Sequence, residues 1–419
     1  MHSEAIDSAS AGRAADKLHR YRETADLFED RGLYPEYHRL DSAGTQPTCQ
    51  IGGRELVTLC SNNYLGLAHH PRVLDAARST LEVHGTGPGG SRCLCGNVDV
   101  LEDLDRAVAD FMGTEDAITF PTGYMANLSA FRALTDPFLG TVHPYAQGTG
   151  TVLCDEGNHA TVFDGVQLSS ARRVLFQHND LEDLERRLSW ADRKGPRVVV
   201  VEGTYSLEGE VAPLPEIVEI CDRHGAILYI DDAHGLGVLG AHGGGALQHF
   251  GLEGRADLVM GSFDKALGGT GGFLAGRRDL IRYLRIAARA YMFSSAVPAA
   301  MAAAMISALE VTRGGELLRR RLRRNYEILR TGLESLGFRV LGDGTVPVAP
   351  ALLGDENLAV HFQKRLFQQG VFAPAFRWPA VPKGMARIRV TPMATHSEEH
   401  LRRALDAFAV VGRELRLVA

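Results

Sequence analysis

The chain has 419 residues, of which 45% are hydrophobic and 23% are charged, and its formal net charge is −6. This composition is ordinary for a globular protein, and the acidic balance gives no reason to expect nucleic acid as a partner. The six cysteines form no CxxC pair and no histidine cluster accompanies them, so neither a zinc site nor a disulfide framework is predicted. The N-terminus is polar, unlike a signal peptide, and the most apolar stretch (296–309) is too short to cross a bilayer. We therefore expect a cytoplasmic protein with no metal and no membrane insertion.

The pattern along the chain predicts three parts. Residues 1–60 are expected to form a helical lead-in and a hairpin that turns at Gly52-Gly53. Residues 61–300 alternate short β-branched runs with amphipathic helices, which predicts a large α/β domain with a mainly parallel sheet covered on both faces. Residues 301–419 are predicted to form a smaller C-terminal α+β domain.

The C-terminal part shows its elements more plainly. Helices are expected over about 315–336 and 357–369, and a strand over 386–391. The last helix is predicted to begin with a capping box in Thr395-His396-Ser397-Glu398. The basic run Arg319–Arg324 lies in the first of these helices, where leucines at helical spacing indicate a solvated helix face rather than a nucleic-acid site.

Polar residues follow the predicted strands of the large domain at the point where each strand ends. The strands are expected at 117–120, 151–154, 173–176, 198–201, 226–230 and 257–260. The residues that follow them are Thr122-Gly123-Tyr124, His159, Glu202, Asp231 and Ser262. Ligands of parallel α/β sheets bind outside the carboxyl ends of the strands, so one edge of the sheet is the predicted active site.

A lysine and an aspartate at this edge indicate a specific cofactor. Lys265 lies in GSFDKALGGTGG, and Asp231 begins DDAHGLG. A lysine amine forms a Schiff base with an aldehyde, and a buried carboxylate pairs with a pyridinium nitrogen, which are the two roles that pyridoxal 5′-phosphate (PLP) requires. His234, three residues after Asp231, is placed to bond the phenolic oxygen of the cofactor. A metal site at Asp231, Asp232 and His234 is the alternative, but further ligands at fitting spacing are missing.

Other residues are suited to bind the cofactor or the substrate, although each also has a structural interpretation. His159, in NHATVFDG, is suited to stack on a ring and to take part in proton transfer, and Ser206 is suited to bond the cofactor or a substrate carbonyl. Thr122-Gly123-Tyr124 opens a helix whose free amides suit a phosphate. Arg387 or Arg389, in ARIRVTP, is suited to clamp a substrate carboxylate. GTGPGGSR (85–92) matches a dinucleotide-binding motif literally, but a helix precedes it and Pro88 interrupts it, so we interpret it as a turn near the active site.

Taken together, these segments resemble the α-oxoamine synthase family of fold type I PLP enzymes. The likeness runs from SNNYLGL (61–67) to RIRVTPMATH (387–396) and includes GTGPGGSR, TGYMAN, NHATVFDG, YSLEGEVAPL, DDAHGLGVLG, GSFDKALG and FSSAVP. The family includes 8-amino-7-oxononanoate synthase, 2-amino-3-ketobutyrate CoA ligase, 5-aminolevulinate synthase and serine palmitoyltransferase. The resemblance implies a seven-stranded, mainly parallel sheet. It also implies a homodimer with active sites at the interface.

The resemblance also implies a role for each residue. Lys265 holds PLP and moves a proton, Asp231 pairs with the pyridine nitrogen, and His159 stacks on the ring. Arg389 is expected to bind the carboxylate of the amino acid, with Asn63 and Arg387 as further substrate-binding residues. The residues expected around the rest of the cofactor are His234, Ser206, Ser262, Thr122, Gly123, Tyr124 and, from the partner, Ser294 or Ser295. The implied reaction condenses glycine, alanine or serine with an acyl-CoA or acyl-carrier-protein thioester, with loss of carbon dioxide, to give an α-amino ketone.

The chain departs from the family pattern in two places, and three rival interpretations remain. The segment from Asn127 to His159 is about ten residues longer than expected, with a loop at 137–150, and the aspartate pair reads DDAH where several members have Asp-Glu-Ala-His. An aminotransferase would share Asp231 and Lys265 but not NHATVFDG together with GTGPGGSR. A non-catalytic partner subunit would lack the lysine, and a dehydrogenase would have to use GTGPGGSR.

Overall fold

A seven-stranded sheet lies at the centre of the larger part of the structure, in the order β3-β11-β10-β9-β6-β4-β5. The computed structural model describes residues 3–31, 34, 37–136 and 150–418, with side chains from residue 17 onward. The strands are β3 (Asp116–Phe120), β4 (Thr151–Asp155), β5 (Arg172–Phe176), β6 (Arg197–Glu202), β9 (Ile227–Asp231), β10 (Leu258–Ser262) and β11 (Gly272–Gly276). The neighbouring strands β10, β9, β6, β4 and β5 are parallel to one another, whereas β11 runs antiparallel to both β10 and β3. The mainly parallel sheet predicted from the sequence is confirmed.

Both faces of this sheet are buried. Val199 and Ile230 belong to one core, whereas Val200 and Tyr229 belong to the core on the other side. Successive side chains of a strand point to opposite faces, so a strand covered on both sides reads as a continuous apolar run. That is why VVVV and AILYI were recognisable as strands.

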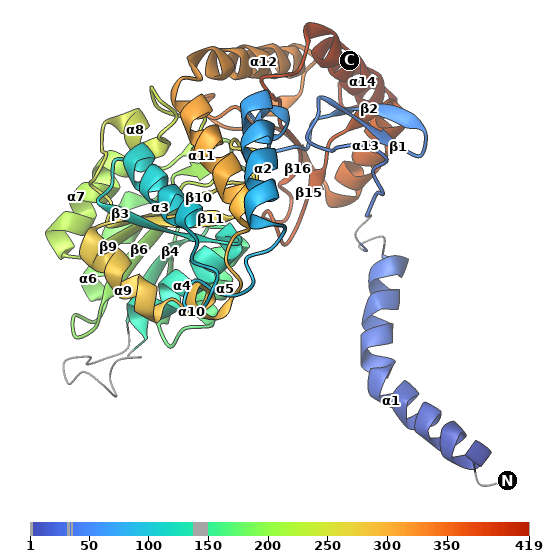
Figure 1. Cartoon of the computed structure of the whole chain (residues 1–419). Coiled ribbons are helices and arrows are strands. Elements are labelled where there is room, and N and C mark those ends of the chain that lie inside the picture. The colour runs from blue at the N-terminus through green and yellow to red at the C-terminus, as the bar shows by residue number, and fades with distance from the viewer. Residues whose placement is uncertain (1–2, 32–33, 35–36, 137–149, 419) are drawn as a thin grey trace.

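Helices form the two outer layers (Figure 1). The residues of the first core come from α2 (Pro71–His84), α3 (Asp99–Met112), α6 (Leu181–Trp190), α7 (Leu214–His224), α8 (Ala246–Phe250) and α11 (Ala299–Arg313). Those of the second come from α4 (Gly123–Thr135), α5 (Ala160–Gln167), α9 (Arg278–Ala287) and α10 (Arg289–Phe293).

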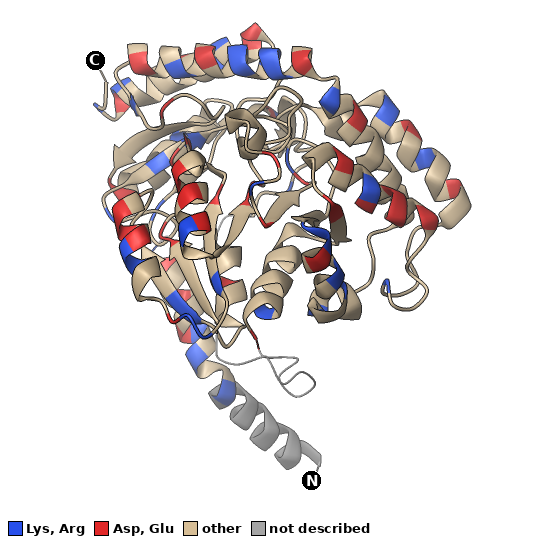
Figure 2. Ribbon diagram, turned by 90° about the vertical axis from the view of Figure 1, so that its left-hand side faces the viewer, with Lys and Arg blue, Asp and Glu red and all other residues tan. Residues whose placement is uncertain are grey.

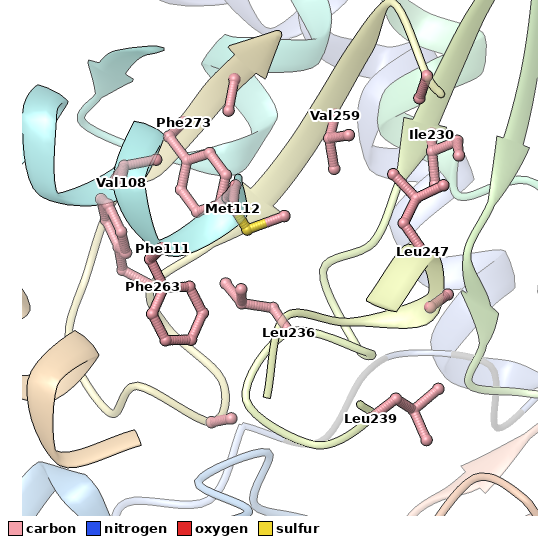
Figure 3. Packing of buried hydrophobic residues seen from close by; sticks show 14 of the residues in the cluster. Val108, Phe111, Met112, Ile230, Leu236, Leu239, Leu247, Val259, Phe263 and Phe273 are labelled. Atoms are coloured by element: carbon pink, nitrogen blue, oxygen red, sulfur yellow. The ribbon is translucent and has the colours of Figure 1, made fainter. Parts of the chain in front are cut away.

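Part of the first core is seen closely in Figure 3. Phe111 and Met112 of α3 lie beside Phe263 and Phe273, and Leu236 lies near them from the loop after β9. Burying one such side chain stabilises the fold by about 1.5–3 kcal/mol relative to its exposure. This packing fixes the loop that carries Lys265, because Phe263 is only two residues before it.

The C-terminal part contains a second sheet, in the order β12-β13-β16-β15. Its strands are β12 (Arg339–Val340), β13 (Ala349–Gly354), β15 (Ala375–Phe376) and β16 (Ala386–Val390). Helices α12 (Glu316–Ser335), α13 (Glu356–Gln368) and α14 (Glu398–Glu414) share a third core with this sheet. The helix and strand expected at 315–336 and 386–391 are confirmed, but the capping box is formed by Ser397 and His400. The helix begins two residues later than the predicted box implied.

The N-terminal segment consists of α1 (Ser3–Asp30) and the hairpin of β1 (Thr48–Ile51) and β2 (Arg54–Thr58), as expected. Strand β2 also pairs in parallel with β14 (Val371–Phe372), so the hairpin joins the C-terminal part. Shorter elements are the 3₁₀ helix η1 (Leu67–His69) and the hairpin of β7 (Thr204–Tyr205) and β8 (Glu210–Val211). The division at residues 60 and 300 stays a prediction.

The surface carries both signs of charge. Figure 2 shows acidic and basic residues interspersed on the outer helices. In the run Arg319–Arg324, Arg320, Arg323 and Arg324 form ion pairs with glutamates, which agrees with a solvated helix face. Among the described helices, none is long and apolar enough to cross a membrane. The loop singled out at 137–150 lies, but for Gly150, outside the described residues.

Candidate active site

The polar residues predicted to share one edge of the sheet do so. Strands β3, β4, β6, β9 and β10 end at Phe120, Asp155, Glu202, Asp231 and Ser262. In the pairing of neighbouring strands, Asp231 lies opposite both Glu202 and Met260. Because these strands are parallel, their carboxyl ends meet at the same edge.

Lys265 lies in the loop between β10 and β11. Its side chain is 16% exposed, and its Nζ lies 3.7 Å from Asp264 Oδ1. The Asp264 carboxylate also accepts a hydrogen bond from the Ser262 hydroxyl. The lysine amine is therefore accessible but held at the sheet edge by its own loop.

The N-terminus of α4 lies against the same edge. Thr122 caps the helix by accepting a hydrogen bond from the Met125 amide, at 3.1 Å. A Cβ added at Gly272 would lie 2.5 Å from Gly123 Cα, so only glycine at position 272 permits this approach. A Cβ at Gly123 itself would lie 3.5 Å from Ser262 Oγ. The free amides of this helix and the Ser262 hydroxyl thus lie together, as an anion site requires.

Asp231 is buried and held by two hydrogen bonds. Its Oδ2 accepts from Asn127 Nδ2 at 2.9 Å, and its Oδ1 accepts from the Ala233 amide at 3.3 Å. Among the described residues, no cationic side chain lies within ion-pairing distance of it. A buried carboxylate of this kind is stabilised by a bound cationic group such as a pyridinium.

His234 is buried at the site, and one of its ring nitrogens bonds to the protein. Its Nδ1 lies 2.8 Å from the Tyr64 hydroxyl. Burial lowers the pKa of His234 well below its usual range, and the charges of Lys265 and Arg389 lower it further. The ring is therefore neutral at pH 7.

His159 caps α5 and keeps an exposed ring surface. Its Nδ1 accepts a hydrogen bond from the Thr161 amide at 3.3 Å. Partial burial lowers the pKa of His159, the Asp231 charge opposes this effect, and the Lys265 charge adds to it. A neutral ring with one free surface is what a stacking partner needs.

Glu202 lies beside Asp231 at the end of β6 and is buried. Burial raises the pKa of Glu202 well above its usual range, and the Asp231 charge raises it further. The raised pKa favours the neutral form of Glu202, which limits the negative charge in the site.

The two arginines of β16 have different partners. Arg387 donates to the carbonyl oxygens of Met385 and Leu207 and lies 3.5 Å from Glu208. Arg389 donates to Ser206 Oγ at 3.2 Å and to Asn62 Oδ1 at 3.0 Å.

The Arg389 guanidinium also lies over the Phe376 ring, 5.0 Å from its centroid. Within the described residues no acidic side chain is paired with Arg389, and its buried Nε lacks a hydrogen-bond acceptor. Arg389 is therefore the better placed of the two arginines to receive a carboxylate.

The remaining predicted residues lie near the edge or in its supports. The Asn63 side-chain amide donates to the Thr45 carbonyl and accepts from the Ala68 amide, so these contacts are structural. The Tyr124 hydroxyl donates to Asp164 at 2.6 Å, and the ring is 44% exposed. Ser295 is exposed and forms no hydrogen bond with the other described site residues.

Sequence reasoning missed three residues at the site, Asn127, Tyr64 and Asn62. Asn127 had a usable signal, because it lies four residues after Gly123 in TGYMAN, on the same side of an expected helix. Asn62 and Tyr64 stand in SNNYLGL on either side of Asn63, the residue that was chosen. Within the described residues there is no group of three potential metal ligands.

Comparison with known proteins agrees with this geometry. The family model described as aminotransferase class I and II matches residues 54–408. The 8-amino-7-oxononanoate synthase of Thermoanaerobacter pseudethanolicus is 39% identical over 95% of this chain and 98% of its own. That of Geobacter sulfurreducens is 40% identical over 93% and 97%.

A solved structure gives the same answer. Serine palmitoyltransferase from S. paucimobilis, with bound PLP and myriocin, superposes with a TM-score of 0.88 at 30% identity, covering 96% of this chain and 99% of its own. This chain belongs to the α-oxoamine synthase group of the class I and II aminotransferase family. The predicted fold type, the enzyme class and PLP as cofactor are confirmed. The predicted reaction class, condensation of an amino acid with an acyl thioester, is confirmed as well.

The residues present fit PLP. Lys265 supplies an accessible amine, and Asp231 is a buried carboxylate with no cation of its own among the described side chains. The α4 amides and the Ser262 hydroxyl lie together, with Gly123 close to Ser262, and would suit the phosphate. Each chemical part of PLP therefore has a matching group at the sheet edge.

Proposed function

We propose that the enzyme joins alanine to a seven-carbon dicarboxylic acyl thioester, with loss of carbon dioxide, to form an α-amino ketone. The proposal rests on the relatives of highest identity reported above, which are named for the product 8-amino-7-oxononanoate. In that product, C8 and C9 correspond to alanine without its carboxyl group, and C1 to C7 correspond to the acyl group. Glycine and serine are the other amino acids that the sequence predicted.

The observation that carries the proposed reaction is Arg389. It has no acidic partner among the described side chains, and it belongs to the same site as Lys265, Asp231 and His159. Arg389 binds the carboxylate of the amino acid in a two-pronged contact, with Ser206 and Asn62 holding its guanidinium in place. When bound, PLP supplies an electron sink for the charge that develops at the α-carbon of the amino acid. With PLP bound, Lys265 Nζ would take the α-proton of the amino acid, and the Asp231 carboxylate would pair with the pyridine nitrogen.

His159 and His234 act as neutral groups in this scheme. His159 would stack on the cofactor ring, and His234, fixed by Tyr64, would bond the phenolic oxygen. Gly123, Tyr124, Thr122 and Ser262 would hold the phosphate end and the ring. Asn63 and Arg387 act on the substrate only through the groups that they support.

We also propose a homodimer with each active site at the interface. Leu94 and Phe293 are 80% and 70% exposed, which is unusual for large apolar side chains. Leu94 lies in the loop that contains Gly90, and Phe293 is the last residue of α10, just before the loop that contains Ser295. A hydrogen bond from Ala296 N to Gly90 O joins these two segments. If two copies bind through these residues, Ser294 or Ser295 of one copy would lie at the phosphate site of the other copy.

Cytoplasmic localisation is part of the same proposal. All six cysteines are free, and Cys93 and Cys95 are exposed. Free exposed thiols are typical of a reducing compartment.

The acyl carrier is CoA or an acyl-carrier protein, and the assay must offer both.

The test is a product assay of the purified holoenzyme. We expect carbon dioxide and free thiol to be released in equal amounts when alanine and the dicarboxylic acyl thioester are supplied together. Glycine and serine, and a long-chain monocarboxylic thioester, serve as comparison substrates. Faster turnover of serine with the long-chain thioester would contradict the proposed pair. Formation of a keto acid without thiol release would indicate an aminotransferase instead.

A further inference from the structure

Asn127 has a buried side-chain amide that contacts Asp231 directly and contacts Thr161, the residue that bonds to His159. It lies on α4 and its side chain is inaccessible to solvent. Its Nδ2 donates to Asp231 Oδ2 at 2.9 Å and to Thr161 Oγ1 at 2.8 Å. Its Oδ1 accepts a hydrogen bond from the Tyr229 hydroxyl at 2.5 Å.

These partners leave one orientation for the amide. If the oxygen and nitrogen were exchanged, the amide oxygen would face the Asp231 carboxylate, and two acceptors would meet in a buried place. With the nitrogen toward Asp231, both of its protons are donated in hydrogen bonds, and the amide oxygen accepts a hydrogen bond from the Tyr229 hydroxyl. The amide is therefore a fixed donor to Asp231.

The same amide sets the direction of the Thr161 hydroxyl. Because Thr161 Oγ1 accepts from Asn127, its own proton points elsewhere, and His159 Nδ1 lies 3.0 Å away. The Thr161 backbone amide also points to this nitrogen, and a backbone amide can only donate. His159 Nδ1 therefore carries a lone pair, and the proton of the neutral ring is on Nε2.

The packing of α5 on α4 makes this chain of contacts possible. A Cβ at Gly165 would lie 2.8 Å from the Asn127 carbonyl oxygen, so glycine is needed for the close approach of the two helices. The approach brings Thr161, at the start of α5, within reach of Asn127. Tyr229, on the neighbouring strand β9, packs on Phe131 with ring centroids 4.9 Å apart.

We propose that Asn127 is a positioning residue that fixes the Asp231 carboxylate and, through Thr161, holds His159 as its Nε2–H tautomer. The consequence is that His159 presents an N–H donor at Nε2, the ring nitrogen that does not contact Thr161. The proposal deepens the proposed function and rests on it for the role of His159 in turnover. The tautomer and the position of Asp231 are properties of the protein without substrate.

The test compares matched variants by ¹⁵N NMR of the imidazole nitrogens in the holoenzyme. His159→Gln identifies the signals of His159. We expect a pyridine-type signal for Nδ1 and a pyrrole-type signal for Nε2 in the wild type. Asn127→Leu keeps the side-chain size but frees the Thr161 hydroxyl to turn, so the two signals should move part of the way toward each other, because the Thr161 backbone amide still donates to Nδ1. Thr161→Val should do the same, whereas Thr161→Ser should retain the wild-type signals.

Activity and folding are measured on the same samples. Asn127→Leu should lower kcat by roughly 10- to 100-fold, less than the full contribution of an acid–base group. Asn325→Leu is the matched control, because Asn325 is also buried but bonds to the carbonyls of Met393 and His396. This control should retain the wild-type imidazole signals and most of the activity.

Two results would overturn the proposal. One is a protonated Nδ1 in the wild type, and the other is an unchanged His159 signal in both Asn127→Leu and Thr161→Val. If the signals shift as expected but no condensation occurs with any thioester, the positioning role stands and the proposed substrates are wrong.

Discussion

Arg389 and Arg387 are two residues apart on one strand, and only their partners distinguish them. Arg387 is held by Glu208 and two carbonyl oxygens, whereas Arg389 is held by neutral groups and lacks an acidic partner among the described residues. A fixed guanidinium with spare donors is suited to bind a carboxylate in a bidentate geometry, which a lysine cannot reproduce.

Replacing Arg389 by lysine should therefore weaken binding of the amino acid. A hydrogen bond to a charged group contributes about 1.5–3 kcal/mol, so KM for the amino acid should rise roughly 10- to 100-fold. The KM for the acyl thioester should change little. Steady-state kinetics with each substrate varied in turn measure both values. Arg387→Lys is the control, and a larger effect on KM in that variant would assign the carboxylate to Arg387.

Single residues also show how far sequence reasoning extends. Lys265, Asp231 and His159 were predicted because each follows a recognisable strand, and the ends of parallel strands meet. Asn127 was not predicted, because its value depends on partners 34 and 104 residues away in the sequence. Its spacing from Gly123 places it on the same side of a helix, but a local pattern does not show which distant residues it contacts.

The hairpin β7–β8 is the element that joins the sheet edge to the C-terminal part. Ser206 and Leu207 bond to the two arginines of β16, while Glu210 faces His178 at 3.6 Å. His178 Nδ1 also lies 2.7 Å from Asp155 at the end of β4. The hairpin is thus held from both sides, and it carries a residue of the proposed substrate site.

The charge of His178 should make this support dependent on pH. Burial disfavours the charged ring, but hydrogen bonds to Asp155 and Glu210 outweigh it and raise the pKa of His178 from 6.5 to about 10. A raised pKa means that the stabilisation is complete below about pH 6.5 and is lost as the pH rises through about 10. Unfolding by urea should therefore show a larger difference between wild type and His178→Gln at about pH 6 than at about pH 9. An equal difference at both values would contradict this role.

Elements differed in how well the sequence revealed them. The buried strands β6 and β9 are uninterrupted apolar runs, and their positions were predicted to within a residue or two. Strand β11 begins and ends with glycine and was not among the strands predicted, although it completes the sheet beside Lys265. Its glycines are explained by close packing, which is a property of the folded chain.

For the whole molecule, Leu94 in its loop and Phe293 at the end of α10 indicate where a second copy would bind. Exposed large apolar side chains in adjacent segments favour burial against a partner. We expect the wild type to be a dimer in analytical ultracentrifugation at micromolar concentration. Phe293→Glu should shift it toward monomer and lower its affinity for PLP. Trp190→Glu, a similar change at a 71% exposed residue of α6, should leave the dimer intact. A wild type that is fully active as a monomer would contradict the proposed interface.

The central claim is that Lys265 carries the cofactor, and borohydride reduction of the holoenzyme tests it most directly. We expect mass spectrometry after digestion to find a pyridoxyl adduct on the peptide that contains Lys265, and none on that peptide in Lys265→Ala. A wild-type holoenzyme that yields no adduct there, or yields it on another lysine, would contradict the account.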